Sequence, residues 1–428
     1  MSSVALAVFA LSVTATPSDA NWPQWRGPNR DGISRETGLL KTWPKDGPKL
    51  LWTFEKTGLG YSGFSVVDDT LYTMGATNGQ NGNEEFVLAL DAGTGKEKWR
   101  TPIGTYFQKE PWGGGPRGTP TVDGDRVYAL GANGDLVCLD RATGKAVWAK
   151  NLVTDFKGEV PEWGYAESVL IDGDRLICTP GGSAGAMAAL NKETGGVVWR
   201  SADFTDQPQY VSVIAADVGG VRQYVTATKA GVYGIRAKDG QKLWGHKVAV
   251  NGVATIPTPI FYKDHVFMTS GYSAGCALIK LTPDGDGTKA AVVYESKAIT
   301  NHHGGVIRVD EYVYGHSDRG GWVCLPFLKA DNRDGPEPVS SWRFDKGSAV
   351  YADGSLYCLA ESTGGQPGTV AKVTPSPDQW KEEGRFTLPK KDERRSPSGG
   401  VWAHPVVSHG KLFLRDQNYL FCYDIKGK

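Results

Sequence analysis

The sequence predicts an all-β protein, an eight-bladed β-propeller whose blades are four-stranded antiparallel sheets. Three observations support this fold class. A turn that ends in Thr-Gly and is followed by an aromatic residue recurs along the chain. Two-residue hairpin turns divide the intervals between its copies. The composition, with 56 Gly, 24 Pro and 14 Trp in 428 residues, is typical of many tight turns that join short strands. No long stretch has the 3.6-residue apolar period of a helix.

Residues 118–148 are the clearest copy of the repeating unit. They read as a strand, an Asp-Gly-Asp turn, a strand, an Asn-Gly-Asp turn, a strand, a Thr-Gly-Lys turn and a last strand that carries Trp148. Asp-Gly and Asn-Gly between alternating apolar residues favour hairpins, because two-residue turns need a positive φ angle. One unit therefore contains four antiparallel strands.

Similar units follow at residues 168–199, 218–244, 257–294, 304–327, 347–373 and 403–424. The last of these supplies only three strands, and residues 48–55 provide the missing fourth strand. The aromatic residues that close the units are spaced by 44 to 51 residues and are Trp52, Trp99, Trp148, Trp199, Trp244, Tyr294, Trp342 and Phe386. Four strands in each period of this length predict a propeller. The closing N-terminal strand leaves the ring without an open edge. A seven-bladed ring is the alternative if residues 347–400 are an insertion.

The N-terminus precedes the repeats and divides into two segments. Residues 1–20 carry an apolar run from Val4 to Val13 and small residues before Ala20, which predicts a signal peptide and a periplasmic or secreted protein. We expect residues 21–47 to cap one face of the ring and residues 48–428 to form the propeller. No later segment approaches 18 apolar residues, so the sequence predicts no transmembrane segment.

Charge and cysteine content exclude several functions. Lys+Arg and Asp+Glu both total 47, and this balance does not support binding of nucleic acid. The six cysteines are isolated and show no spacing typical of a metal site, so we expect buried free thiols. We also expect a monomer.

The turns "LDAGTGKEKW", "LDRATGKAVW" and "LNKETGGVVW" resemble the tryptophan-docking motif of the PQQ-like β-propellers. That family includes the quinoprotein dehydrogenases and the outer-membrane β-barrel assembly lipoprotein, and the resemblance covers residues 21–426. It implies the fold strongly and the function weakly, because propellers serve as enzymes, receptors and scaffolds. The motif has a structural explanation: each tryptophan packs over the neighbouring blade. The predicted docking residues are Trp52, Trp99, Trp148, Trp199, Trp244 and Trp342.

The resemblance to quinoprotein dehydrogenases also implies a cofactor arrangement. Those enzymes combine PQQ with a disulfide between adjacent cysteines, a Ca²⁺ ion held by Glu and Asn, and an Asp base. No two cysteines are adjacent in this chain, and no positions match those metal ligands. We therefore expect no cofactor, and PQQ dependence is disfavoured.

The channel mouth is the predicted ligand site, because the first strand of each blade lines the channel. Aligning the repeats gives one set of equivalent positions at Tyr61, Arg117, Ala166, Ile256, His303, Lys346 and Trp402. A second set lies two residues further on and includes Ser168, Thr258 and His404. These positions vary in residue type, whereas the docking turns repeat, and such variation is typical of a ligand site. The predicted ligand-binding residues are Arg117, Tyr165, Glu167, His303, Lys346, Trp402 and His404.

A metal site at His302 and His303 is not expected, because adjacent residues on a strand point to opposite faces. The sequence then leaves two functions open. The first is a non-catalytic binding or scaffold module for a protein partner or a carbohydrate or anionic small ligand. The alternative is an oxidoreductase or hydrolase that acts on a sugar or polyol at the same mouth, for which no catalytic residue is assigned. We favour the first.

Overall fold

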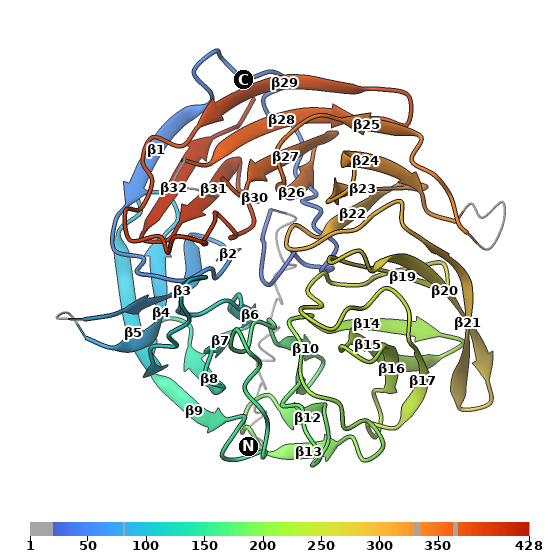
Figure 1. Ribbon diagram of the computed structural model, residues 1–428. Coiled ribbons are helices and arrows are strands. Elements are labelled where there is room, and N and C mark those ends of the chain that lie inside the picture. Colours follow the sequence, from blue (N-terminus) through green and yellow to red (C-terminus); the bar gives the residue numbers. More distant parts are fainter. Residues whose placement is uncertain (1–19, 80–81, 329–333, 363–366, 428) are drawn as a thin grey trace, which may run out of the picture.

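A computed structural model describes residues 20–79, 82–328, 334–362 and 367–427. Eight four-stranded antiparallel sheets surround a central channel (Figure 1), and the described residues contain no α-helix. The eight-bladed, all-β prediction is confirmed. The predicted signal peptide lies outside the described residues except for Ala20. None of the described elements is a helix that could span a membrane.

We number the blades in chain order, and within each blade the first strand is the innermost. Blades one to four consist of β2–β5 (Ser65–Val67, Thr70–Thr77, Glu84–Asp91, Glu97–Thr105), β6–β9 (Thr121–Asp123, Arg126–Leu130, Asp135–Asp140, Ala146–Asn151), β10–β13 (Leu170–Asp172, Arg175–Cys178, Ala188–Asn191, Val197–Arg200) and β14–β17 (Ile214–Val218, Val221–Ala227, Val232–Arg236, Lys242–His246). Blades five to eight consist of β18–β21 (Ile260–Tyr262, His265–Ser270, Gly275–Asp284, Gly287–Ser296), β22–β25 (Val306–Val309, Tyr312–Ser317, Gly321–Pro326, Ser340–Trp342), β26–β29 (Gly347–Ala352, Ser355–Ala360, Thr369–Pro375, Trp380–Thr387) and β30–β32 (Val406–Ser408, Lys411–Asp416, Tyr419–Asp424) with β1 (Lys49–Phe54).

The eighth blade joins the two ends of the chain, as the sequence predicts. Strand β1 pairs antiparallel with β32, and Trp52 lies opposite Cys422. Figure 1 shows this contact where the blue N-terminal strand meets the red C-terminal strands. The seven-bladed alternative is wrong, because β26–β29 pair in order as a complete sheet of their own.

The repeated turns join each blade to the next. The indole Nε1 of Trp99 in blade one donates a hydrogen bond of 3.1 Å to the carbonyl oxygen of Arg141 in blade two. The same ring lies against Gly144, where a Cβ atom would come within 2.6 Å of it. Gly144 has a φ of +71°, so the turn requires glycine both for its backbone angle and for the space that the indole fills. The tryptophans that donate to a carbonyl of the next blade in this way are Trp52, Trp99, Trp148 and Trp199.

Two of the predicted docking residues make different contacts. Trp244 donates a hydrogen bond of 2.7 Å to Gln223 within its own blade. Trp342 stacks on Phe344 with ring centroids 4.7 Å apart and on Trp380 of the next blade at 6.0 Å. The turns of the next blade that these two rings would meet, at residues 282–287 and 375–380, lack the Thr-Gly sequence.

The hydrophobic core lies between the blades. The middle strands are buried on both faces, as in β8, while the outermost strands such as β9 remain partly exposed. This pattern follows from stacking, because each sheet is covered on both faces by its neighbours. All six cysteines are buried, and none forms a disulfide.

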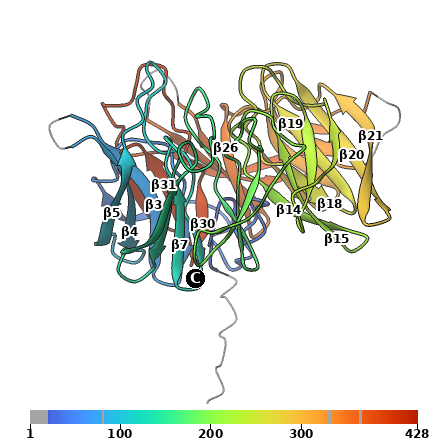
Figure 2. The ribbon, with the colours of Figure 1, turned by 90° about the horizontal axis from the view of Figure 1, so that it is seen from below.

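Residues 21–47 run across one end of the channel. Trp22 pairs with Val66 of blade one, Ser34 donates its backbone N–H to Tyr351 of blade seven, and Leu40 donates to Ile425. A blue loop of this segment lies in the centre of the ring (Figure 1). The side view shows it towards the lower end of the channel (Figure 2). These contacts are those that a capping segment would make, and the capping role stays a prediction.

Candidate functional site

A cavity of about 200 Å³ lies at the channel mouth. Its walls come from the chain segments that precede the innermost strand of each blade, and seven of the eight blades contribute. The first set of aligned positions supplies Tyr61, Arg117, Ala166, Ile256, His303 and Trp402. The second set supplies Ser168, Thr258, Gly305 and His404, and the fourth blade, which the alignment did not assign, adds Tyr210 and Ser212. The positions where the repeats differ in sequence therefore converge on one cavity, which we call the mouth pocket.

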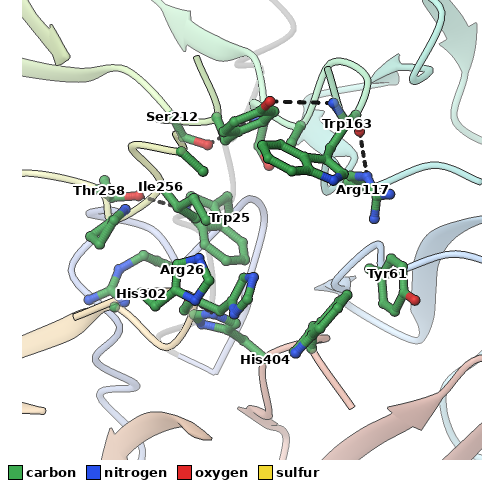
Figure 3. A pocket seen from close by; sticks show the side chains of 18 of the residues that line it. Trp25, Arg26, Tyr61, Arg117, Trp163, Ser212, Ile256, Thr258, His302 and His404 are labelled. Atoms are coloured by element: carbon green, nitrogen blue, oxygen red, sulfur yellow. Dashed lines mark hydrogen bonds between the residues drawn. The ribbon is translucent and has the colours of Figure 1, made fainter. Parts of the chain in front are cut away.

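The capping segment completes the mouth pocket from the channel side. Trp25 and Arg26 both line it. The indole of Trp25 donates a hydrogen bond of 2.9 Å to the hydroxyl of Thr258, and its ring lies 4.6 Å from that of His404 (Figure 3). Arg26 is held in place by hydrogen bonds to the carbonyl oxygens of Asp31 and Val306. The N-terminal segment thus contributes directly to the site.

Aromatic rings form most of the pocket wall. Tyr61 and Trp402 lie 4.8 Å apart, and Trp402 stacks on His303 at 4.7 Å with planes only 21° apart. Trp112 and Tyr272 line the pocket as well, although their side chains are 43% and 49% exposed. They mark the outer rim, where a ligand would meet them first.

Four of the seven predicted site residues line the pocket: Arg117, His303, Trp402 and His404. Tyr165 and Glu167 do not, because Ala166 and Ser168 face the channel and their neighbours in this extended segment point the other way. The Tyr165 hydroxyl donates to the carbonyl of Pro180, and the Glu167 carboxylate accepts the backbone N–H of Thr179.

Lys346 occupies an aligned position but turns away from the pocket. Its ammonium lies 3.0 Å from Asp318 and donates a hydrogen bond of 3.2 Å to Nδ1 of His302. The carboxylate of Asp318, in the neighbouring blade, thus holds the lysine outside the pocket. An alignment of the repeats does not show such a contact between blades. His303 of blade six stacks on Trp402 of blade eight, so no described residue of blade seven lines the pocket between them.

Several lining residues were not predicted from the sequence. Trp112 and Trp163 lie in loops between blades, and Trp25 and Arg26 lie in the capping segment. None of these positions belongs to the repeat, so no periodic signal marks them. The abundance of tryptophan was the available hint, but it did not distinguish pocket rings from docking rings.

The lining is electropositive. Among the described residues that line the pocket there are two arginines and three histidines but neither Asp nor Glu. Arg117 donates from Nε to the carbonyl of Trp163 at 2.6 Å (Figure 3) and from Nη2 to that of Gly113 at 2.7 Å. Its guanidinium lies 4.9 Å from the centre of the Tyr61 ring. Within the described chain it has no ion-pair partner and Nη1 has no hydrogen-bond acceptor.

Glu361 stands behind His303 and orients it. Its Oε1 lies 3.4 Å from Nδ1 of His303. Burial alone would raise the pKa of Glu361, but the hydrogen bond from His303 and the charges of His303 and Lys346 lower it to about 2. Because the carboxylate is ionised, Nδ1 of His303 carries the proton, and Nε2 is the ring nitrogen left for a ligand.

The other two histidines are neutral and already engaged. Burial, together with the charges of His303 and Lys346, lowers the pKa of His302 to about 2. Burial and the charge of Arg26 lower that of His404 to about 3, and its Nε2 donates to the carbonyl of His303 at 3.0 Å. Each of the three histidines thus uses one ring nitrogen, and in His303 the other nitrogen, Nε2, has no hydrogen-bond partner among the described residues.

His302 and His303 lie in a bend before β22 and not on a strand, so the alternation that we expected for them does not apply. Their rings are 3.8 Å apart, and both line the pocket. Even so, the described residues contain no group of three or more His, Cys, Asp or Glu that could hold a metal ion.

The PQQ arrangement that the resemblance implies does not fit these residues. It would need a carboxylate base and a carboxylate calcium ligand at the pocket, and the described lining offers neither. Its pair of adjacent cysteines is also missing from the chain. We derive no chemical step through this cofactor.

Fold and site together define an eight-bladed propeller with a pocket at one mouth of its channel. A protein-family profile described as outer membrane protein assembly factor BamB matches residues 83–327, which is more than half of the chain. The chain therefore belongs to this family of PQQ-like propellers, and the resemblance seen in the docking turns is confirmed.

Solved structures share the fold at low sequence identity. BamB from Moraxella catarrhalis matches with a TM-score of 0.54 and 14% identity over 89% of this chain and 98% of its own. The computationally designed Ika8 protein matches at 0.58 and 11% over 88% and 100%. The quinohemoprotein alcohol dehydrogenase ADHIIG from Pseudomonas putida HK5 matches at 0.52 and 12% over 96% and 81%. No curated protein matches significantly in sequence. At these identities the likeness shows the fold alone.

Proposed function

We propose that this protein is an extracytoplasmic binding module that holds a small carbohydrate ligand in the mouth pocket, without catalysing a reaction. The proposal rests on the composition of the wall of the mouth pocket, which combines stacked aromatic rings with polar groups. Aromatic faces provide apolar contact for the flat side of a sugar ring, and placed polar groups orient its hydroxyls. Arg117, His303, Trp402 and His404 are the proposed contact residues.

The capping segment supports this function by closing the channel behind the ligand. Trp25 fills the space beneath the pocket and is fixed by Thr258. A ligand would therefore enter and leave through the rim at Trp112 and Tyr272. The predicted signal peptide supports a periplasmic or secreted location, and the family description as an assembly factor supports a scaffold role for the outer surface of the ring.

Binding can be tested by intrinsic fluorescence, because several tryptophans line the pocket. We expect D-glucose, N-acetylglucosamine or D-glucuronate to change the emission of the full chain with saturation. The substitution Trp402→Ala should abolish the change, because it removes the ring between Tyr61 and His303. Trp380→Phe is the matched control, since Trp380 lies outside the pocket and packs on Trp342. If none of the three sugars binds, the proposal is wrong.

One observation favours an enzyme as the second candidate. A histidine oriented by a carboxylate, with its other nitrogen facing a pocket, has the arrangement of a general base. His303 and Glu361 have this arrangement. An oxidoreductase or hydrolase acting on the bound sugar would release a product that chromatography detects, and His303→Ala would abolish it. A sugar that binds and is recovered unchanged supports the binding module.

A further inference from the structure

The mouth pocket contains a guanidinium, that of Arg117, which forms no ion pair within the described residues. Arg117 uses two of its nitrogens to hold the carbonyls of Trp163 and Gly113, and neither carbonyl carries a negative charge. A guanidinium stays protonated in proteins, and burial of an uncompensated charge is costly. Burial lowers the pKa of Arg117, which reflects this desolvation. An anion at Nη1 would compensate the charge.

The other residues that line the pocket also favour an anionic ligand. The carboxyl whose charge acts on Arg117 is that of Glu85, which accepts the backbone N–H groups of Phe107 and Ala132 and whose pKa is raised by burial to about 7. Two other carboxylates near the pocket are paired, Glu361 with His303 and Asp318 with Lys346. No Asp or Glu among the described residues lines the pocket, although the chain as a whole has equal numbers of acidic and basic residues. The site is therefore electropositive within a neutral protein, and it favours a ligand of opposite charge.

A second polar group lies across the channel from Arg117. Arg117 precedes the first strand of blade two, and His303 precedes that of blade six, so the two are half a ring apart in a ring of eight. Glu361 fixes His303 with Nε2 free, and none of the described residues forms a hydrogen bond to that nitrogen. A ligand hydroxyl can donate to or accept from an imidazole nitrogen.

Between these two groups the wall is continuous. The guanidinium of Arg117 lies over Tyr61 at 4.9 Å, Tyr61 lies 4.8 Å from Trp402, and Trp402 stacks on His303 at 4.7 Å. A ring-shaped ligand that spans from Arg117 to His303 would lie along these aromatic faces. The wall from Arg117 to His303 thus offers a site for an anion, an apolar surface and a site for a hydroxyl group.

We propose that the ligand is a sugar acid, a hydroxylated ring that carries one carboxylate. The carboxylate binds Arg117, a hydroxyl group binds Nε2 of His303, and the ring lies against Tyr61 and Trp402. This inference rests on the proposed function, because it names the ligand class of the same pocket. It adds a specificity that the aromatic wall alone does not give, namely preference for an acidic over a neutral sugar.

Isothermal titration calorimetry of the full chain tests this specificity with three probes. D-Glucuronate has the carboxylate and the hydroxyls, D-glucose lacks the carboxylate, and benzoate lacks the hydroxyls. We expect D-glucuronate to bind about 10- to 100-fold more tightly than D-glucose, the range typical of a charge-assisted hydrogen bond. Benzoate should bind more weakly than D-glucuronate, because it leaves His303 without a partner.

Variants assign the preference to individual residues. Arg117→Ala should reduce the affinity for D-glucuronate to that for D-glucose, and Arg117→Lys should retain part of the preference, because it keeps the charge without the planar fork. His303→Ala should weaken both sugars and leave their ratio unchanged. Arg385→Ala is the matched control and should change neither affinity, because Arg385 pairs with Glu382 on the outer strand β29.

The outcomes separate the two proposals. If neither sugar binds, the proposed function fails and the inference with it. If D-glucose binds as tightly as D-glucuronate, or if Arg117→Ala weakens both equally, the binding function stands and the sugar acid is wrong. If benzoate binds as tightly as D-glucuronate, the hydroxyl contact at His303 is wrong.

Discussion

Substituting Gly144 by alanine should destabilise the protein through the contact that joins blades one and two. Two effects add. Alanine at a φ of +71° is strained by about 1–2 kcal/mol, and its Cβ would come within 2.6 Å of the Trp99 ring, which overpacks the interface by about 1–3 kcal/mol. The total is about 2–5 kcal/mol. An unfolding entropy of about 2.1 cal/mol/K per residue gives the 428-residue chain about 0.9 kcal/mol/K, so Tm should fall by about 2–6 °C.

The same blade provides a matched control at Gly124. This glycine also has a positive φ, of +53°, but a Cβ there would meet nothing within 4 Å. Gly124→Ala should therefore cost only the backbone strain, about 1–2 kcal/mol, and lower Tm by about 1–2 °C. The difference between the two variants isolates the contact with Trp99. Differential scanning calorimetry measures both.

A double-mutant cycle tests the reasoning further. In a Trp99→Ala background, Gly144→Ala should cost no more than Gly124→Ala, because the ring that it would strike is absent. If Gly144→Ala has the same effect with and without Trp99, the indole does not explain why glycine is required in the docking turn. The blade-to-blade role of the motif would then have to be abandoned.

Three further predictions follow from buried groups. Arg30 donates hydrogen bonds to the carbonyls of Ser168 and Val213 at 2.9 and 2.8 Å. Arg30→Ala should therefore cost about 3 kcal/mol of stability and lower Tm by about 3 °C. An unchanged Tm by calorimetry would contradict the anchoring of the capping segment. Burial raises the pKa of Glu167 from 4.5 to about 7, so its stabilising contribution is complete below pH 4.5 and is lost as the pH rises through 7. The Tm of Glu167→Gln minus that of the wild type should therefore rise by about 3 °C between pH 4.5 and 8, and a constant difference would contradict the burial of this carboxyl. The six cysteines are buried, and burial raises the pKa of the Cys138 thiol to about 11. A thiol reagent at pH 8 should therefore label none of them in the folded protein and all six in denaturant. Fast labelling of the folded chain would contradict the burial of these thiols in the core between the blades.

The repeat allowed the architecture to be predicted from sequence in detail. The hairpin turns predicted the strand boundaries, and the number of closing aromatic residues predicted the number of blades. Residues 48–55 matched the missing strand of the eighth blade. These features depend on local turn chemistry and on a period, and both are visible in a single chain. The contacts of Trp244 and Trp342 were less predictable, because they depend on individual side chains, Gln223 of the same blade and Trp380 of the next.

The pocket was predictable only where it follows the repeat. The aligned positions of the blades gave Arg117, His303, Trp402 and His404, because equivalent residues occupy equivalent places around the ring. Tyr165 and Glu167 were included although they are adjacent to lining positions and so face the other side of the chain. Trp25 was not predicted, because it lies in a segment that has no repeat. The path of such a segment depends on tertiary contacts, and for Trp25 one of them is the hydrogen bond to Thr258.

The most direct test of the account is a crystal structure of the full chain grown with D-glucuronate. We predict density for the sugar in the mouth pocket, with its carboxylate at Arg117, a hydroxyl at Nε2 of His303 and its ring against Trp402. An empty mouth pocket at a sugar concentration that saturates binding in solution, or a sugar bound on the outer strands, would contradict the central claim.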